Sequence, residues 1–217
     1  MLSRVLGVAT VAASHSLDMS SLQLASDFRR RAIVLAIFIG LLWFIHALDA
    51  PFGRDVSVAG TGVIPRTYDG LFGILTAPLI HESWGHLINN TLPLIVLGAL
   101  ILVRGIDEFL FVLLCTTLIS GLGVWIFGAS GNHIGASGLV YGFAGFLLFR
   151  SAFDRNWRSL LVTLVVAIGY STVLASGLIP HDRISWTSHF FGFAGGFVAA
   201  RLRYPARSTR FRIVDHD

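Results

Sequence analysis

Long apolar segments dominate this sequence and restrict the folds that are open to it. Each of six segments is 18 to 25 residues long, near the length that a helix needs to cross a bilayer core of about 30 Å. In lipid, backbone polar groups must be satisfied internally, so these segments are expected to be helices. The sequence therefore predicts an all-α membrane protein, a six-transmembrane-helix bundle. The segments are 32–49, 79–103, 109–128, 136–153, 158–178 and 185–203.

The composition excludes an ordinary soluble domain. Of the 217 residues, 54% are hydrophobic and 13% are charged, and the apolar residues occur in long blocks, as in integral membrane proteins. In such a protein a net charge of +4 reports topology more often than nucleic-acid binding, so we expect no nucleic-acid partner. The single cysteine, Cys115, lies in an apolar segment and excludes an internal disulfide.

Arginine supplies all sixteen basic residues, and their positions predict the orientation of the chain. If six helices alternate, only Arg54, Arg66 and Arg183 fall on one side. By the positive-inside rule the other side is cytoplasmic, and both termini lie there. Arginine without lysine also indicates a GC-rich genome, which is typical of many bacteria. We therefore expect a multi-pass protein of a bacterial plasma membrane. The arginines of the cytoplasmic side near the helices are Arg29, Arg30, Arg31, Arg104, Arg150, Arg155, Arg158, Arg201, Arg203, Arg207, Arg210 and Arg212.

The segments divide the chain into three parts. Residues 1–31 are expected to form a cytoplasmic N-terminal tail, 32–203 the six-helix domain, and 204–217 a basic cytoplasmic tail. The second tail would contact anionic lipid headgroups. Met19 could be the true start, so the sequence leaves open whether residues 1–18 belong to the mature protein.

The stretch HESWGHLINN, residues 81–90, brings two histidines and two asparagines to the start of an apolar segment. It differs from the zinc-protease signature, which needs histidines four residues apart on one helix face. His81 and His86 are five apart, about 140° out of register. His86 and Asn90 are four apart and share a face, so we expect them to serve one partner, and no metal.

Polar groups in three segments are predicted to lie at one depth. Counting back from the arginine that ends each segment, at about 1.5 Å per residue, places Ser137 roughly 20 Å, His189 roughly 18 Å and Asn90 roughly 21 Å from the cytoplasmic side. In a hydrocarbon core of about 30 Å, all three then lie on the order of 10 Å below the outer surface. Polar groups at membrane depth are costly and indicate function.

Small residues one helical turn apart predict that two of these segments lie close together. The fourth segment has such a step at 138–142 and the sixth at 192–196, and such steps let helix backbones approach closely in lipid. A close crossing of these faces would set the hydroxyl of Ser137 against the imidazole of His189.

This arrangement is typical of nucleophilic catalysis. A serine needs a neighbouring base, and His189 supplies one. No carboxylate follows His189 on its segment, and Asp182 lies in a loop, so a Ser–His dyad is predicted. The tetrahedral intermediate needs donors for its oxyanion, which the Asn90 amide, the His86 imidazole and the Ser137 backbone N–H could supply.

Two neighbouring side chains have plainer interpretations. We expect Tyr141 to pack in the bundle and to orient the histidine of the dyad by stacking. The presence of a histidine at position 81 is explained by a structural hydrogen bond as readily as by a functional role.

The motifs HESWGHLINN, GASG and SHFFGFAGG, in this order on six segments, resemble those of rhomboid intramembrane serine proteases, and the resemblance covers about residues 32–203. It implies that Ser137 is the nucleophile and His189 the general base. It also implies that His86 and Asn90 are oxyanion donors, and that Gly135 lets the loop before the serine approach.

The resemblance further implies cleavage of single-pass membrane proteins near the outer face, after small residues. The substrate would enter between the second and fifth helices, and no metal or cofactor would be needed. One departure lies in the first external connection. Many bacterial members carry Trp-Arg shortly before the second helix, where this chain has Leu71, Phe72 and Gly73. That departure leaves the role of this loop open.

Two other classes of protein are compatible with the pattern. One is a catalytically silent relative that binds membrane proteins. The other is a small-solute transporter, against which the chain shows neither an internal repeat nor an acidic residue in mid-membrane, features common in transporters. Neither the physiological substrate nor the oligomeric state is encoded in a recognisable motif.

Overall fold

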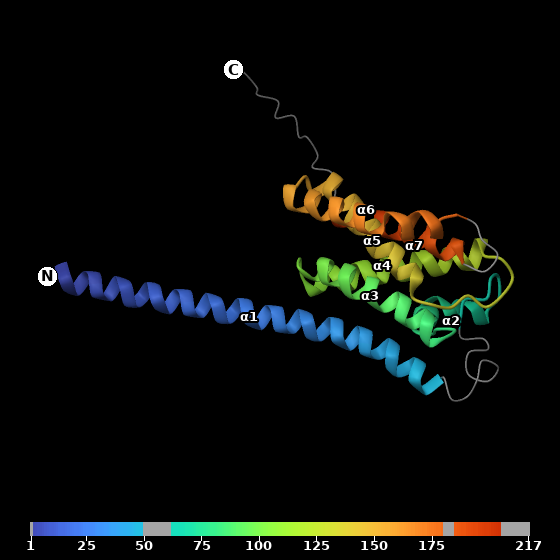
Figure 1. Ribbon diagram of the computed structural model, residues 1–217, viewed down its shortest axis with the longest axis horizontal. Coiled ribbons are helices and arrows are strands. Elements are labelled where there is room, and N and C mark those ends of the chain that lie inside the picture. The colour runs from blue at the N-terminus through green and yellow to red at the C-terminus, as the bar shows by residue number, and fades with distance from the viewer. Residues whose placement is uncertain (1, 50–61, 180–184, 205–217) are drawn as a thin grey trace, which may run out of the picture.

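The computed structural model describes residues 2–49, 62–179 and 185–204, with side chains from residue 22 onward. Within these ranges the chain is helical, apart from the connections and one isolated β-bridge between Val63 and His133. Figure 1 shows most of the helices gathered in one bundle, with the first running along its edge. The elements are α1 (Leu2–Asp49), α2 (Asp69–Thr76), the 3₁₀ helix η2 (Ala77–Leu79), α3 (Trp84–Leu102), α4 (Ile106–Phe127), α5 (Ser137–Asp154), α6 (Trp157–Gly177) and α7 (Trp186–Arg203).

The predicted class, an all-helical membrane protein, is confirmed. Helices α1 and α3 to α7 overlap the six predicted segments. Four stretches in the described ranges are long and apolar enough to cross a membrane: Leu22–Asp49 of α1, α3, α4 and α6. The shorter α5 and α7 carry glycines and polar residues that lower their hydropathy. The count of six spans and the cytoplasmic side of the termini stay predictions.

The two ends of the predicted domain differ in how far the structure describes them. Helix α1 begins at Leu2, so most of the region predicted as an N-terminal tail continues the first segment as helix. No proline interrupts residues 2–49, which removes the main obstacle to one long helix. The basic tail lies outside the described residues after Tyr204.

Helix α2 and η2 occupy the connection before α3, where no helix was predicted. Gly70 and Gly73 explain how this short element packs. A Cβ atom at either residue would collide with the backbone of residues 62–64, so glycine permits the close approach. Helix α2 also packs against α4, and η2 leads directly to the stretch that begins with His81.

Helix α5 lies at the centre of the bundle, in contact with α3, α4, α6 and α7, and its most extensive partner is α7, which also packs against α4. The contact between α5 and α7 runs through Gly142 and Gly196. A Cβ atom at Gly196 would collide with the carbonyl oxygen of Gly142 and lie 2.5 Å from the backbone nitrogen of Phe146. The two backbones therefore approach as closely as the glycine spacing predicts. An apolar core that includes the fully buried Phe109, Phe143 and Phe146 fills the space beside this contact.

We expect Gly196→Ala to lower the free energy of unfolding by about 1–3 kcal/mol, because the added methyl group forces α5 and α7 apart. Gly40→Ala is the matched control, since a Cβ atom there meets nothing within 4 Å. Thermal unfolding of both variants in detergent, followed by tryptophan fluorescence, measures the difference. Equal melting temperatures would contradict the close-packed contact.

Candidate active site

Ser137 and His189 meet at one end of the bundle. Ser137 is the first residue of α5, and His189 lies in the first turn of α7. The structure places Oγ of Ser137 2.8 Å from Nε2 of His189. The histidine is only 7% exposed, so this hydrogen bond is largely shielded from competing partners.

The other nitrogen of His189 determines the direction of that hydrogen bond. Nδ1 lies 2.9 Å from the carbonyl oxygen of Gly177, and a carbonyl only accepts. Nδ1 therefore carries the proton, which leaves Nε2 of a neutral ring to accept from the hydroxyl of Ser137. The ring also stacks on Tyr141, with centroids 4.2 Å apart and planes 9° apart. Asp182, the other carboxylate weighed from the sequence, lies outside the described residues.

The loop before Ser137 is held by backbone and side-chain contacts from three directions. His133 forms both hydrogen bonds of the bridge with Val63, at 2.9 and 3.0 Å. Its Nδ1 lies 2.8 Å from Oγ of Ser185, directly before α7. The N–H of Gly135 donates to the carbonyl of Ala77 in η2 at 2.9 Å. These contacts fix the chain that delivers the serine.

His81 adds a contact from a fourth direction. It lies before α3 and is 2% exposed, and its Nε2 accepts a 3.4 Å hydrogen bond from the N–H of Ala136. A ring nitrogen that accepts from a backbone N–H carries no proton itself, and this contact favours the structural interpretation of the histidine.

His86 and Asn90 lie one turn apart on α3, and the structure brings His86 against the serine loop. A Cβ atom at Gly135 would lie 2.6 Å from Cε1 of His86. The φ angle of Gly135 is also +114°, a conformation that glycine adopts readily. Asn90 is 6% exposed, and its Nδ2 donor is buried without a hydrogen-bond partner among the described residues.

His46 is a residue of this region that the sequence analysis missed. It lies on α1, is 4% exposed, and both its ring nitrogens are buried without a partner in the described part of the chain. Its ring packs edge-on against Trp84 at 4.5 Å and lies 6.4 Å from that of His81. Its position inside the apolar segment 32–49 was the available signal. No described group of three or more His, Cys, Asp or Glu residues is arranged to hold a metal.

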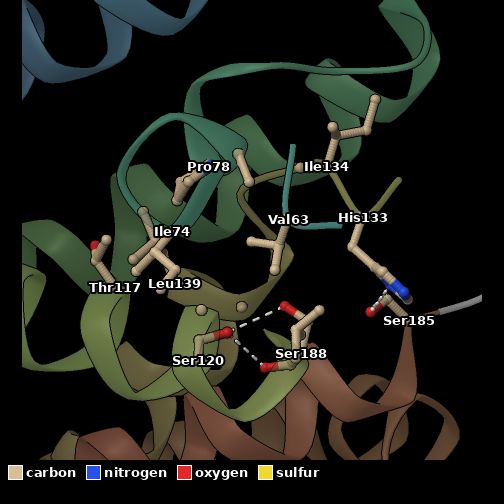
Figure 2. Close-up of a pocket in the computed structure, with 15 residues that line it drawn as sticks. Val63, Ile74, Pro78, Thr117, Ser120, His133, Ile134, Leu139, Ser185 and Ser188 are labelled. Atoms are coloured by element: carbon tan, nitrogen blue, oxygen red, sulfur yellow. Dashed lines mark hydrogen bonds between the residues drawn. The ribbon is translucent and has the colours of Figure 1, made fainter. Parts of the chain in front are cut away.

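A small cavity with a mixed lining of apolar and hydroxyl side chains adjoins the serine loop. Figure 2 shows Ser120 of α4 bonded to Ser188 of α7, through the carbonyl at 2.9 Å and the hydroxyl at 3.1 Å. Gly135 and Gly138, on either side of Ser137, line the same cavity. Its volume is about 30 Å³, enough for a water molecule.

The fold and this site define a class: a helical membrane protein that holds a serine and a neutral histidine in hydrogen-bond contact at one end of its bundle. The sequence predicted that Ser137 and His189 would meet, and the structure adds His46, Gly177 and the loop contacts. A backbone carbonyl leaves no side-chain signal, so no pattern in the sequence could have identified it.

Comparison with known proteins identifies the family. The Rhomboid domain model matches residues 68–206. Uncharacterized protein Rv1337 of Mycobacterium tuberculosis is 36% identical over 183 residues, covering 80% of this chain and 75% of that protein. YdcA of Bacillus subtilis, named as a candidate rhomboid protease, is 26% identical over 145 residues, covering 64% and 70%. RHOMBOID-like protein 1 of Arabidopsis thaliana is 32% identical over 136 residues, covering 58% and 32%. The chain belongs to the rhomboid family, which confirms the resemblance.

Gly135→Ala should reduce cleavage of a transmembrane reporter by about a hundredfold, because the methyl group would displace either His86 or the serine loop. Gly131→Ala is a close control. Its φ angle is +137°, so it carries the same backbone strain, but its Cβ atom would meet nothing within 4 Å. Equal losses in the two variants would show that strain alone, and not the contact with His86, accounts for the effect.

Two leucine substitutions distinguish the roles of the buried histidines. His81→Leu removes the acceptor of Ala136 N–H and should lower the free energy of unfolding by about 1–3 kcal/mol. His46→Leu removes two unpartnered polar atoms and should leave it unchanged or raise it. Thermal unfolding in detergent measures both. A loss in His46→Leu as large as that in His81→Leu would mean that the His46 ring has a bonding partner.

Proposed function

We propose that this protein is a serine endopeptidase that hydrolyses peptide bonds in or near the transmembrane segments of single-pass membrane proteins. The observation that carries the proposal is the contact of Ser137 with a neutral His189 whose other nitrogen donates to Gly177. Membership of the rhomboid family supports it, as does the likeness to YdcA, whose name describes a protease.

The reaction begins with His189 as general base. As Oγ of Ser137 attacks the scissile carbonyl carbon, its proton moves to Nε2, and the ring becomes an imidazolium whose Nδ1–H still donates to Gly177. The ring then gives the proton to the leaving amine nitrogen, the C–N bond breaks, and an acyl ester remains on the serine. Water, activated in turn by His189, hydrolyses this ester and restores the hydroxyl.

The oxyanion of the tetrahedral intermediate would be stabilised from three sides. His86 and Asn90 offer ring and amide donors from α3, and Ser137 offers its backbone N–H in the first turn of α5, where such groups lack intrahelical partners. Burying the Asn90 amide without a partner costs free energy in the resting protein. A donor held in this way is free to bond the oxyanion without first breaking another contact.

The remaining predicted features belong to the same proposal. We place the protein in a bacterial plasma membrane as a multi-pass protein, in keeping with its mycobacterial relatives. Its partners would be transmembrane substrates and the surrounding lipids. The proposed steps use only side chains, backbone groups and water, so they require neither a metal nor a cofactor.

A fluorophosphonate or isocoumarin probe tests the proposed nucleophile. The wild-type protein should become labelled and cleave a transmembrane reporter, whereas Ser137→Ala should lose both properties. His189→Ala should lose at least 99% of its rate, because the serine then lacks its base (removal of a triad member costs about 10⁴-fold or more elsewhere). Ser171→Ala is a control, since this exposed hydroxyl bonds only within its own helix.

The alternatives make different predictions in the same assay. A silent binding relative would retain transmembrane proteins without labelling or cleavage. A transporter would carry solute into proteoliposomes regardless of the Ser137→Ala change. Cleavage that persists in Ser137→Ala would falsify the assignment of the nucleophile.

A further inference from the structure

Helix α6 is attached to the bundle mainly along one side. Its principal partner is α5, and most of its other surface is exposed, as expected for a helix that faces lipid. The contacts between α5 and α6 matter for the site because α6 ends at Gly177, the acceptor of the His189 proton.

Side-chain hydrogen bonds secure the first half of α6. Ser159 accepts from Arg150 at 2.7 and 3.1 Å and donates to Asp154 at 2.5 Å. One turn further on, Thr163 donates to the carbonyl of Leu147 at 2.9 Å. These bonds are buried or partly buried, and they tie α6 to the end of α5 that lies away from Ser137.

The last turns of α6 are secured differently. Among the described residues, two hydrogen bonds from side-chain donors link this half to α5 and α7. Tyr141 Oη donates to the carbonyl of Val173 at 2.5 Å, and His189 Nδ1 donates to that of Gly177 at 2.9 Å. The two donors are the stacked rings of the site. The same two rings therefore hold the end of α6 by donating hydrogen bonds to its backbone carbonyls.

We propose that Tyr141 is a positioning residue whose hydroxyl seats the last turn of α6 on the site, so that Gly177 holds the proton of His189 on Nδ1. This inference rests on the proposed function, because it concerns the competence of His189 as the base. If the end of α6 moved away, Nδ1 would lose its acceptor, and the proton could reside on Nε2 instead. A ring protonated on Nε2 cannot accept from Ser137.

Gly177 fits this role for a steric reason. A Cβ atom there would collide with the hydroxyl of Tyr141 and lie 2.8 Å from Nδ1 of His189. Glycine is therefore the residue that lets the α6 backbone reach both rings at once. Stacking alone would orient the ring of His189, but it would not select the nitrogen that carries the proton.

Tyr141→Phe keeps the stacked ring and removes only the hydroxyl. We expect kcat for a transmembrane reporter to fall by about tenfold, the equivalent of about 1.4 kcal/mol, with KM changed less than twofold. Tyr204→Phe is the matched control. It removes a hydroxyl that bonds to Glu108 and Arg104 far along the chain from the site, and it should leave both constants unchanged. Wild-type kcat in Tyr141→Phe would overturn the inference.

A second pair of variants tests the backbone itself. Gly177→Ala should reduce kcat more than Tyr141→Phe does, because the methyl group displaces the carbonyl from His189. Gly169→Ala lies on the same helix, where a Cβ atom meets nothing within 4 Å, and should behave as the wild type. An active Gly177→Ala protein would overturn the inference even if Tyr141→Phe were slow.

NMR of protein labelled with ¹⁵N in its histidine rings gives a readout independent of cleavage. The wild type should show His189 protonated on Nδ1, with the signal assigned by its absence in His189→Gln. Tyr141→Phe should show a mixture of the two ring tautomers, and Tyr204→Phe should not. A pure Nδ1 tautomer in Tyr141→Phe would contradict the proposed role.

Ser137→Ala separates the failure of this inference from that of the proposed function. If Ser137→Ala still cleaves the reporter, the protease assignment itself fails. If Ser137→Ala is inactive while Tyr141→Phe matches the wild type in kcat and in its ring signals, only the role of the Tyr141 hydroxyl is wrong.

Discussion

The close contact between the backbones of α5 and α7 is the feature on which the rest of the structure depends. Gly142 and Gly196 allow it, because any larger side chain would separate the two helices. In lipid, apolar side chains gain little by leaving one apolar environment for another, so tight packing between small residues carries much of helix association. The same contact sets the distance between Ser137 and His189. The packing of α5 against α7 and the geometry of the site therefore both depend on these small residues.

Around this contact, the site combines firmly held and unsatisfied polar groups. The serine loop is anchored to η2, to the Val63 bridge, to His81 and to the start of α7. By contrast, Asn90, His46 and the Nδ1 atom of His81 present buried nitrogens without partners in the described chain. Such groups are destabilising unless water or a reacting molecule satisfies them.

The sequence predicted the parts of this structure that leave a side-chain pattern. The glycine steps predicted the close pair of α5 and α7, and with it the contact between Ser137 and His189. The common membrane depth of Ser137, His189 and Asn90 stays a prediction. Helix α2 was missed because eight residues are too short for a reliable period. His46 was overlooked although its segment was identified. The hydropathy of α5 and α7 is low for the reason that lets them pack closely: glycine and polar residues replace aliphatic ones where the two backbones meet.

In the proposed mechanism, the carbonyl of Gly177 takes the place that a carboxylate holds in a Ser-His-Asp triad. A carboxylate buried near lipid would carry a desolvation cost of several kcal/mol, whereas a peptide oxygen brings no formal charge. With a neutral imidazole, His189 and its acceptor then carry no net charge before the reaction. In the proposed mechanism, charge develops only when the hydroxyl of Ser137 attacks. The acceptor is also part of the main chain, so no exchange of its own side chain can delete it. Only a shift of the helix that bears it can disconnect it from the imidazole.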